Sequence, residues 1–262
     1  MCRLNMSYLI VENRPVGFFS NFNLIAGALN YIRENNIDKF YVFWQNPFYQ
    51  DQNYNLFDKY FFQQQPIQEF TVQKSAFDLG IHILCEPEKE KGQLNFVPYK
   101  KLHNTLKHFN YFSNPVYSEC KNKAAIKQKS LGVHVRYTDH AYHGKLLPLQ
   151  DYFDAIDKKI NDYENIFVAT DEIKVIKAFS ERYGDRVYWN ESVIRSDNSD
   201  PLHQGKYLDQ REKLATDVIT DAISLSLCDE LMLTSSNVTH YVFMLNPDLK
   251  YSKIDWQVEH IN

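Results

Sequence analysis

The chain lacks the motifs that usually announce a nucleotide-binding protein. Its 262 residues contain only 8 glycines, and neither a GxGxxG fingerprint nor a Walker loop occurs. A dinucleotide or ATP site therefore has no motif to support it. An Asp-x-Asp pair, of the type that holds a metal-bound sugar nucleotide, is also missing. A phosphate ligand would then have to be neutralised by an arginine and by helix N-termini.

Other absences narrow the class further. Four cysteines occur without a CxxC pair, which argues against a zinc site or a disulfide framework. No apolar run approaches the roughly 20 residues that cross a bilayer, and the N-terminus lacks the apolar core of a signal peptide. The net charge of −4 does not suit a bulk nucleic-acid binder. We expect a cytoplasmic globular protein, and leave peripheral contact with a membrane surface open.

The most informative stretch is 131–145, LGVHVRYTDHAYHGK. Aliphatic residues alternate there with His134 and Arg136, which predicts a short strand that runs into a polar loop. The two polar residues are two positions apart and point to the same side of the strand. A guanidinium is costly to bury unless it meets an anion, and its planar fork of donors matches phosphate oxygens. Arg136 is thus a candidate phosphate clamp, with pairing to Asp139 or Asp171 as the structural alternative.

The remaining chain divides into two expected lobes, 1–120 and 121–262. The first begins as strand, turn, helix and strand, with the strands at 7–11 and 39–44. Gly17 in that turn would let a ligand approach the backbone, although an ordinary tight turn explains it equally. Weaker patterns predict a strand and a helix, at 79–84 and 99–112.

The second lobe shows strands that alternate with helices, which predicts a parallel sheet. The expected strands are 131–136, 165–170, 186–189 and 229–234. The expected helices begin at Pro148, after Asp171, at Leu208 and at Val238, with Asp171 as a helix cap and Gly184 as a helix end. A long polar stretch, 190–207, is of the kind that is often functional or mobile.

Ligands of open parallel sheets bind beyond the C-terminal ends of the strands. Three polar clusters fall at those ends: His134, Arg136 and Asp139; Thr170 and Asp171; Ser235, Ser236 and Asn237. The last cluster opens a helix, where N–H groups attract an anion, so we predict a diphosphate site. Asp221 can accept two N–H bonds from a purine edge, or it lies on a solvated helix face.

Four motifs in this order resemble the fucosyltransferase superfamily, which includes α1,6-fucosyltransferases, nodulation fucosyltransferases and protein O-fucosyltransferases. They are GFFSNF (17–22), HVRYTD (134–139), FVATDE (167–172) and ATDVITDAISLSLCDELMLTSSN (215–237). The resemblance implies an α/β, GT-B-like fold of two Rossmann-like lobes with parallel sheets and a cleft between them. The first lobe would face the acceptor and the second would bind the nucleotide-sugar.

The resemblance also implies inverting, metal-independent transfer of fucose from GDP-fucose to a hydroxyl of a glycan acceptor in glycan biosynthesis, without a cofactor. By position, Arg136 would bind the β-phosphate, and His134 and Asp221 would hold the guanine. The other implied donor contacts are Gly17, Phe18, Ser20, Asn21, Asp171, Ser235, Ser236 and Asn237.

One departure keeps alternatives open. The family usually has a second arginine where this chain has Tyr137. Use of another nucleotide-sugar, or a non-catalytic nucleotide- or glycan-binding role, is therefore the alternative function.

Inverting transfer needs a base for the acceptor hydroxyl, and a histidine suits that task. We place His143, and after it His140, beside Arg136 as catalytic candidates, with surface histidines as the plain alternative. A metallohydrolase built on Asp139 and these two histidines is disfavoured by the His-x-x-His spacing.

Overall fold

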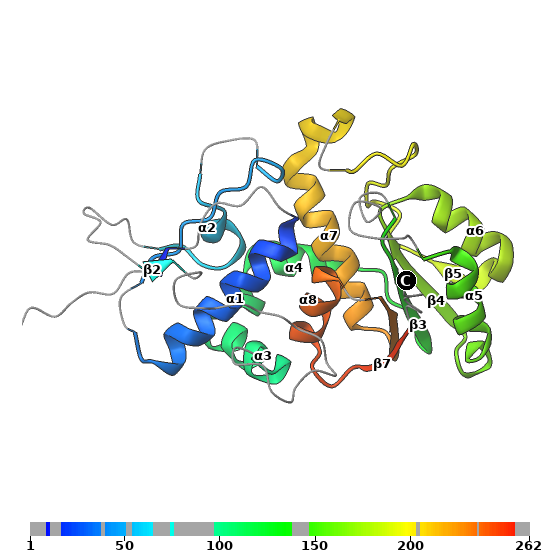
Figure 1. Cartoon of the computed structure of the whole chain (residues 1–262), viewed down its shortest axis with the longest axis horizontal. Coiled ribbons are helices and arrows are strands. Elements are labelled where there is room, and N and C mark those ends of the chain that lie inside the picture. The colour runs from blue at the N-terminus through cyan, green and yellow to red at the C-terminus, as the bar shows by residue number, and fades with distance from the viewer. Residues whose placement is uncertain are drawn as a thin grey trace, which may run out of the picture. The chain divides into compact units, whose positions relative to one another are not determined.

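The computed structural model describes residues 9–10, 17–37, 40–50, 54–64, 74–75, 97–137, 147–202, 205–234 and 236–254. The chain forms two compact units, Met1–Glu119 and Cys120–Asn262. Figure 1 labels most of their helices and strands.

The first unit is mainly helical in its described part. Its elements are β1 (Leu9–Ile10), α1 (Phe18–Glu34), α2 (Leu56–Tyr60), β2 (Lys74–Ser75), α3 (Tyr99–His108) and the 3-10 helix η1 (Tyr111–Ser113), while α4 (Pro115–Lys123) spans the boundary between the units. The two short strands pair in parallel. The helix expected at 99–112 is confirmed with an earlier end, and the strand expected at 79–84 lies outside the described residues.

The strand expected at 39–44 is wrong where the structure describes it, because 40–46 has no regular structure. Side-chain amides take the place of a neighbouring strand there. The Asn55 amide donates to Val42 O at 2.7 Å and accepts from Trp44 N at 2.8 Å. The Gln64 side chain bonds both backbone groups of Val42. Backbone groups that are satisfied in this way do not need a sheet.

Aromatic rings form the core of the first unit. Phe18 packs on Trp44 and Tyr60, with ring centroids 5.1 and 4.9 Å apart. Phe22 stacks on Phe61 at 4.7 Å. All five rings are buried, and such large side chains supply much apolar area per residue. The abundance of Phe and Tyr in this half of the chain therefore serves packing.

The second unit is a parallel α/β domain. Its strands are β3 (Ser130–Val135), β4 (Asn165–Thr170), β5 (Val187–Tyr188), β6 (Glu230–Leu233) and β7 (Lys250–Lys253), and its helices are α5 (Leu149–Asp157), α6 (Ile173–Tyr183), α7 (Arg211–Ser226) and α8 (Asn237–Leu245). The short 3-10 helices are η3 (Ile160–Asp162), η4 (Gly184–Arg186) and η5 (Gly205–Gln210). All neighbouring strands are parallel, in the order β5-β4-β3-β6-β7. The four expected strands are confirmed, β5 being shorter than expected, and β7 was not foreseen.

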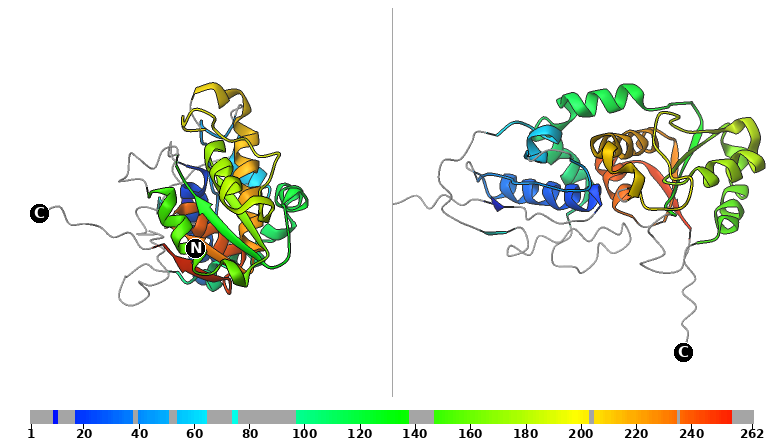
Figure 2. Two further views of the ribbon diagram at one scale, coloured as in Figure 1. Left: turned by 90° about the vertical axis from the view of Figure 1, so that its right-hand side faces the viewer. Right: turned by 90° about the horizontal axis from the view of Figure 1, so that it is seen from above.

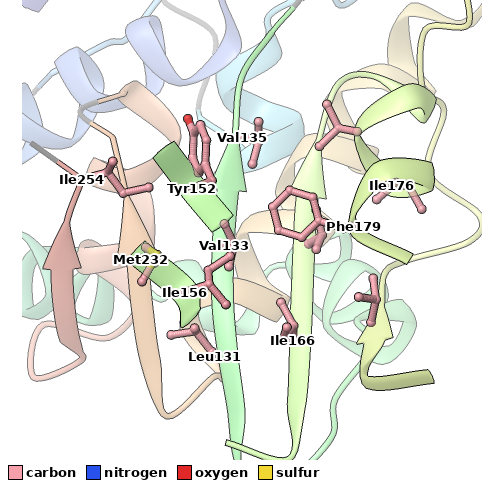
Figure 3. Close-up of a cluster of buried hydrophobic side chains, with 13 residues drawn as sticks. Leu131, Val133, Val135, Tyr152, Ile156, Ile166, Ile176, Phe179, Met232 and Ile254 are labelled. Carbon is pink, nitrogen blue, oxygen red and sulfur yellow. The ribbon is translucent and has the colours of Figure 1, made fainter. Parts of the chain in front are cut away.

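The sheet, with β3 at its centre, lies between two layers of helices. Its residues Leu131, Val133 and Val135 pack with Ile156 of α5 and Phe179 of α6 in one apolar cluster, which Figure 3 shows. The intervening residues face α7 and α8. Figures 1 and 2 show the sheet between these two helix pairs. Because both faces are covered, β3 and β4 are buried at nearly every position, as is usual for parallel sheets.

Gly132 of β3 lies against the C-terminal end of α7 and the residues that follow it. A Cβ at this position would lie 3.0 Å from Cys228 Sγ and 3.2 Å from Leu225 Cδ2. We expect Gly132→Ala to lower the free energy of unfolding in urea by about 1–3 kcal/mol, because the added methyl group overpacks this contact. In a Cys228→Ala background the loss should be smaller. An equal loss in both backgrounds would contradict the steric explanation.

Candidate functional site

The sheet has a topological switch at the C-terminal end of β3. The chain proceeds outward from β3 through β4 to β5, and then returns to place β6 on the other side of β3. The crevice beyond the strands at such a point is where open α/β sheets bind ligands. His134 is the penultimate residue of β3 and is buried, and its Nδ1 lies 3.4 Å from Oγ of Ser236, the N-cap of α8. Two of the predicted clusters therefore meet across the switch.

Ser236 is held in place by a capping box at the start of α8. Its hydroxyl accepts from Thr239 N at 3.2 Å, and Thr239 Oγ1 accepts from Ser236 N at 3.2 Å. Asn237 is the first residue of the helix, whereas Ser235 lies outside the described residues. The positive end of the α8 dipole points to the same place as the serine hydroxyl. This combination suits an anionic group.

Asp171 joins the ends of β3 and β4. Its Oδ1 accepts from Tyr137 N at 2.9 Å. The expectation that it caps the following helix is wrong, because the N-cap of α6 is Glu172, which makes no side-chain capping bond. Arg136 is half-buried directly before the tethered Tyr137, so its backbone is fixed at the switch.

A cation lies next to Tyr137. The Lys174 Nζ atom is 5.3 Å above the centre of the tyrosine ring and 2.7 Å from Glu172 Oε2. The Tyr137 hydroxyl donates to Leu147 O at 3.2 Å, and burial raises the pKa of this phenol above its usual value. Tyr137 is thus a neutral, fixed side chain whose ring faces a lysine ammonium.

Asp221 is buried, so the alternative of a solvated helix face is wrong. Its Oδ1 accepts from Asn190 Nδ2 at 2.6 Å, and its Oδ2 lies 3.4 Å from an Nη atom of Arg195. The pKa of the Asp221 carboxyl is raised to about 6, chiefly because the group is buried and to a smaller extent because Asp217 is near. Arg195 and Asn190 act in the opposite direction, since they favour the ionised form. An acid with such a pKa changes charge close to neutrality.

The predicted residues of the first unit stand at the start of α1. Gly17 is its N-cap, but its φ of −53° suits any residue and an added Cβ would meet nothing within 4 Å. The Phe18 ring belongs to the aromatic core, and Asn21 is buried, whereas Ser20 is half-buried. The catalytic candidates His140 and His143, together with Asp139, lie outside the described residues.

Sequence reasoning missed Asn190 and Arg195, the two partners of Asp221. Both belong to the polar stretch 190–207, whose length was the only signal in the sequence. The structure places this stretch beside β4, where Ser196 N donates to Asp171 O at 2.8 Å. In the described part of the chain, no three His, Cys, Asp or Glu residues gather in the manner of metal ligands. Nor is any described helix both long and apolar enough to span a bilayer.

The architecture is that of the GT-B fucosyltransferases. Crystal structures of NodZ α1,6-fucosyltransferase match most of the chain. The one soaked with GDP-fucose has a TM-score of 0.56 and 13% identity, over 93% of this chain and 94% of that one. The structure of NodZ from Bradyrhizobium has a TM-score of 0.53 and 14% identity, over 93% of this chain and 94% of that one. The structure of POFUT1 in complex with GDP has a TM-score of 0.50 and 11% identity, over 96% of this chain and 99% of that one.

No protein-family model and no curated sequence matches the chain. At the identities of the matched structures, the likeness establishes the fold alone.

The raised pKa of Asp221 predicts a pH dependence of stability. An unfolded aspartate has a pKa of about 3.9, so between about pH 4 and 6 the folded chain holds a proton that the unfolded chain has lost. This contribution to stability is full below pH 4 and is lost as the pH rises through about 6.

The measurement is urea unfolding of the wild type and of Asp221→Asn between pH 4 and 8. As the pH rises from 4, the free energy of unfolding of the wild type, relative to that of the variant, should fall by at most about 3 kcal/mol and level off above the folded pKa of Asp221. A difference that stays constant or grows with pH would contradict the assignment.

Proposed function

We propose that the protein is an inverting, metal-independent glycosyltransferase that moves fucose from GDP-fucose to a hydroxyl group of a glycan acceptor. The observation that carries this proposal is the contact of His134 with Ser236 at the switch point of a fucosyltransferase fold. Among the matched structures of that fold, one NodZ crystal was soaked with GDP-fucose and another was co-crystallised with GDP.

The residues at the switch suit the diphosphate of such a donor. Arg136 would offer its planar guanidinium to the β-phosphate, while Ser236, Asn237 and the N-terminus of α8 would offer hydroxyl, amide and backbone donors. Asp171 would serve indirectly, since its bond to Tyr137 N fixes the backbone that carries Arg136. With these donors, charge can be neutralised without a metal ion.

The guanine would be held by His134 and Asp221. A carboxylate that already takes one donor on each oxygen retains further lone pairs for two N–H groups. For Gly17, Phe18, Ser20 and Asn21 at the start of α1, a role in donor binding stays a prediction from the resemblance.

In the transfer, the acceptor oxygen forms a bond to the anomeric carbon of fucose as the bond from that carbon to the β-phosphate oxygen breaks. The electron pair leaves with GDP, whose developing negative charge Arg136 would stabilise. The hydroxyl proton passes to a base, for which we propose His143, with His140 as the second candidate. Attack opposite to the leaving group inverts the anomeric configuration.

Tyr137 supports a second candidate function, a protein that binds a nucleotide or glycan without turnover. Its phenol is neutral where the resembling family has a second arginine, so one cation fewer would face the leaving group. A transferase that uses another nucleotide-sugar is the third candidate.

The first experiment is calorimetric titration with GDP and GDP-fucose in the presence of EDTA. We expect both to bind to the wild type, and Arg136→Ala to weaken the binding about tenfold to a hundredfold, because a charge-assisted phosphate contact is lost. Arg182→Ala is the matched control. This exposed arginine in the last turn of α6 pairs with Asp157, away from the switch. A wild type that binds no guanine nucleotide would overturn the proposed donor.

Turnover separates the transferase from the binding protein. With GDP-fucose and a panel of glycan acceptors in EDTA, we expect acceptor-dependent release of GDP and a fucosylated product of inverted anomeric configuration by NMR. Retention of configuration would refute the direct displacement. Tight GDP-fucose binding without transfer to any acceptor would favour the non-catalytic alternative.

A further inference from the structure

Arg195 is a buried cation that none of the roles above uses. Its side chain is only 3% exposed, and its Nη1 donates to Asn190 O at 2.9 Å and to Val193 O at 3.0 Å. Its Nη2 faces Asp221 Oδ2 at 3.4 Å. Its Nε is buried and has no hydrogen-bond partner among the described residues. Burial of an incompletely satisfied guanidinium is costly, so its position calls for an explanation.

Attachment of the surrounding segment does not require the guanidinium. Ile194 N donates to Asp217 Oδ2 at 2.8 Å, and Lys213 Nζ donates to Ser192 O at 2.6 Å, which fastens the segment to α7. Ser196 is bonded on the other side through its backbone to Asp171 and Ile173. The segment is therefore held before and after Arg195, and these bonds point the arginine toward Asp221.

The contact of Arg195 with Asp221 differs from an ordinary ion-pair clamp. At 3.4 Å the pair is longer than the 2.7–2.9 Å typical of a charge-assisted hydrogen bond, so the guanidinium acts mainly through its charge. Orientation comes from Asn190, whose Nδ2 bonds Asp221 Oδ1 at 2.6 Å and whose Oδ1 accepts from Ala125 N at 2.6 Å. Arg195 thus places a positive charge beside the Asp221 carboxylate, and Asn190 orients that carboxylate. Each carboxylate oxygen can still accept a further hydrogen bond.

We propose that Arg195 is a positioning residue that keeps the Asp221 carboxylate ionised inside the domain, and so makes the site specific for a guanine base. A guanine edge presents two adjacent N–H donors, whereas adenine presents a donor beside an acceptor. Only the ionised carboxylate can accept from both guanine donors, since a protonated one must donate. This inference rests on the proposed function, and refines it by naming the residue that selects the base.

The test compares GDP with inosine diphosphate, which lacks the 2-amino group. Both carry the same diphosphate, so the ratio of their dissociation constants is independent of phosphate titration. Calorimetry between pH 5 and 8 should show that the wild type prefers GDP about tenfold at pH 8, because a hydrogen bond to a charged acceptor is at stake. As the pH falls, the preference should vanish when Asp221 becomes protonated near pH 6. The charged groups that act on the Asp221 carboxyl are Arg195 and Asp217.

Substitution of Arg195 should move this pH profile. In Arg195→Met the midpoint should rise by about one pH unit or more, because the buried carboxyl loses its neighbouring cation. Arg195→Lys keeps a charge and should retain the preference for GDP with a midpoint close to that of the wild type. Arg182→Met, the same change at an exposed site, should leave the ratio and its midpoint unaltered.

The outcomes are distinguishable. A wild type that binds no guanine nucleotide overturns the proposed function and this inference with it. A wild type that prefers GDP, with the same midpoint in Arg195→Met, overturns the role of Arg195 alone. A wild type that binds GDP and inosine diphosphate equally at pH 8 overturns the selection of guanine and leaves the proposed function standing, and this measurement remains decisive if Arg195→Met does not fold.

Discussion

The parallel pairing of β3 with both β4 and β6 is the constraint on which the second unit depends. It places one strand in the centre of the sheet with helices against both faces, so nearly every β3 residue is buried. Helices α5 and α6 pack on the aliphatic residues of β3 at one face of the sheet. At the other face, the end of α7 approaches so closely that a side chain at Gly132 would crowd it. The polar end of β3 is then the only part of this strand that can meet a ligand.

Polar bonds at that end convert a strand terminus into a fixed site. Asp171 holds the backbone of Tyr137, and the capping box of α8 holds Ser236 against His134. These bonds come from three different strand ends, and none depends on a long flexible side chain. A site assembled in this way is rigid before a ligand arrives, which reduces the entropy that binding must overcome.

The two units solve the problem of burial differently. The second uses a parallel sheet, whereas the described part of the first relies on aromatic rings and on side-chain amides that bond the backbone around Val42 and Trp44. This explains why the strand expected at 39–44 does not form. Alternating large apolar residues predict a strand only when another strand is available, and Asn55 and Gln64 are far enough along the chain to be invisible to a local pattern.

The sequence by itself determined β3 to β6 and α5 to α8 of the second unit, because apolar period and turn residues act over a few positions; β7, with the sequence KYSK, has no such pattern. It also singled out His134, Arg136 and Asp171, since polar residues at strand ends are exceptional in a buried sheet, and Asp221 in a helix as an acid that can pair with a purine edge. Only the tertiary structure decided what these residues do: that Asp171 accepts from Tyr137 rather than capping α6, and that Asp221 is buried with Arg195. Such partners come from distant segments, and their burial and charge exist only after the chain has folded.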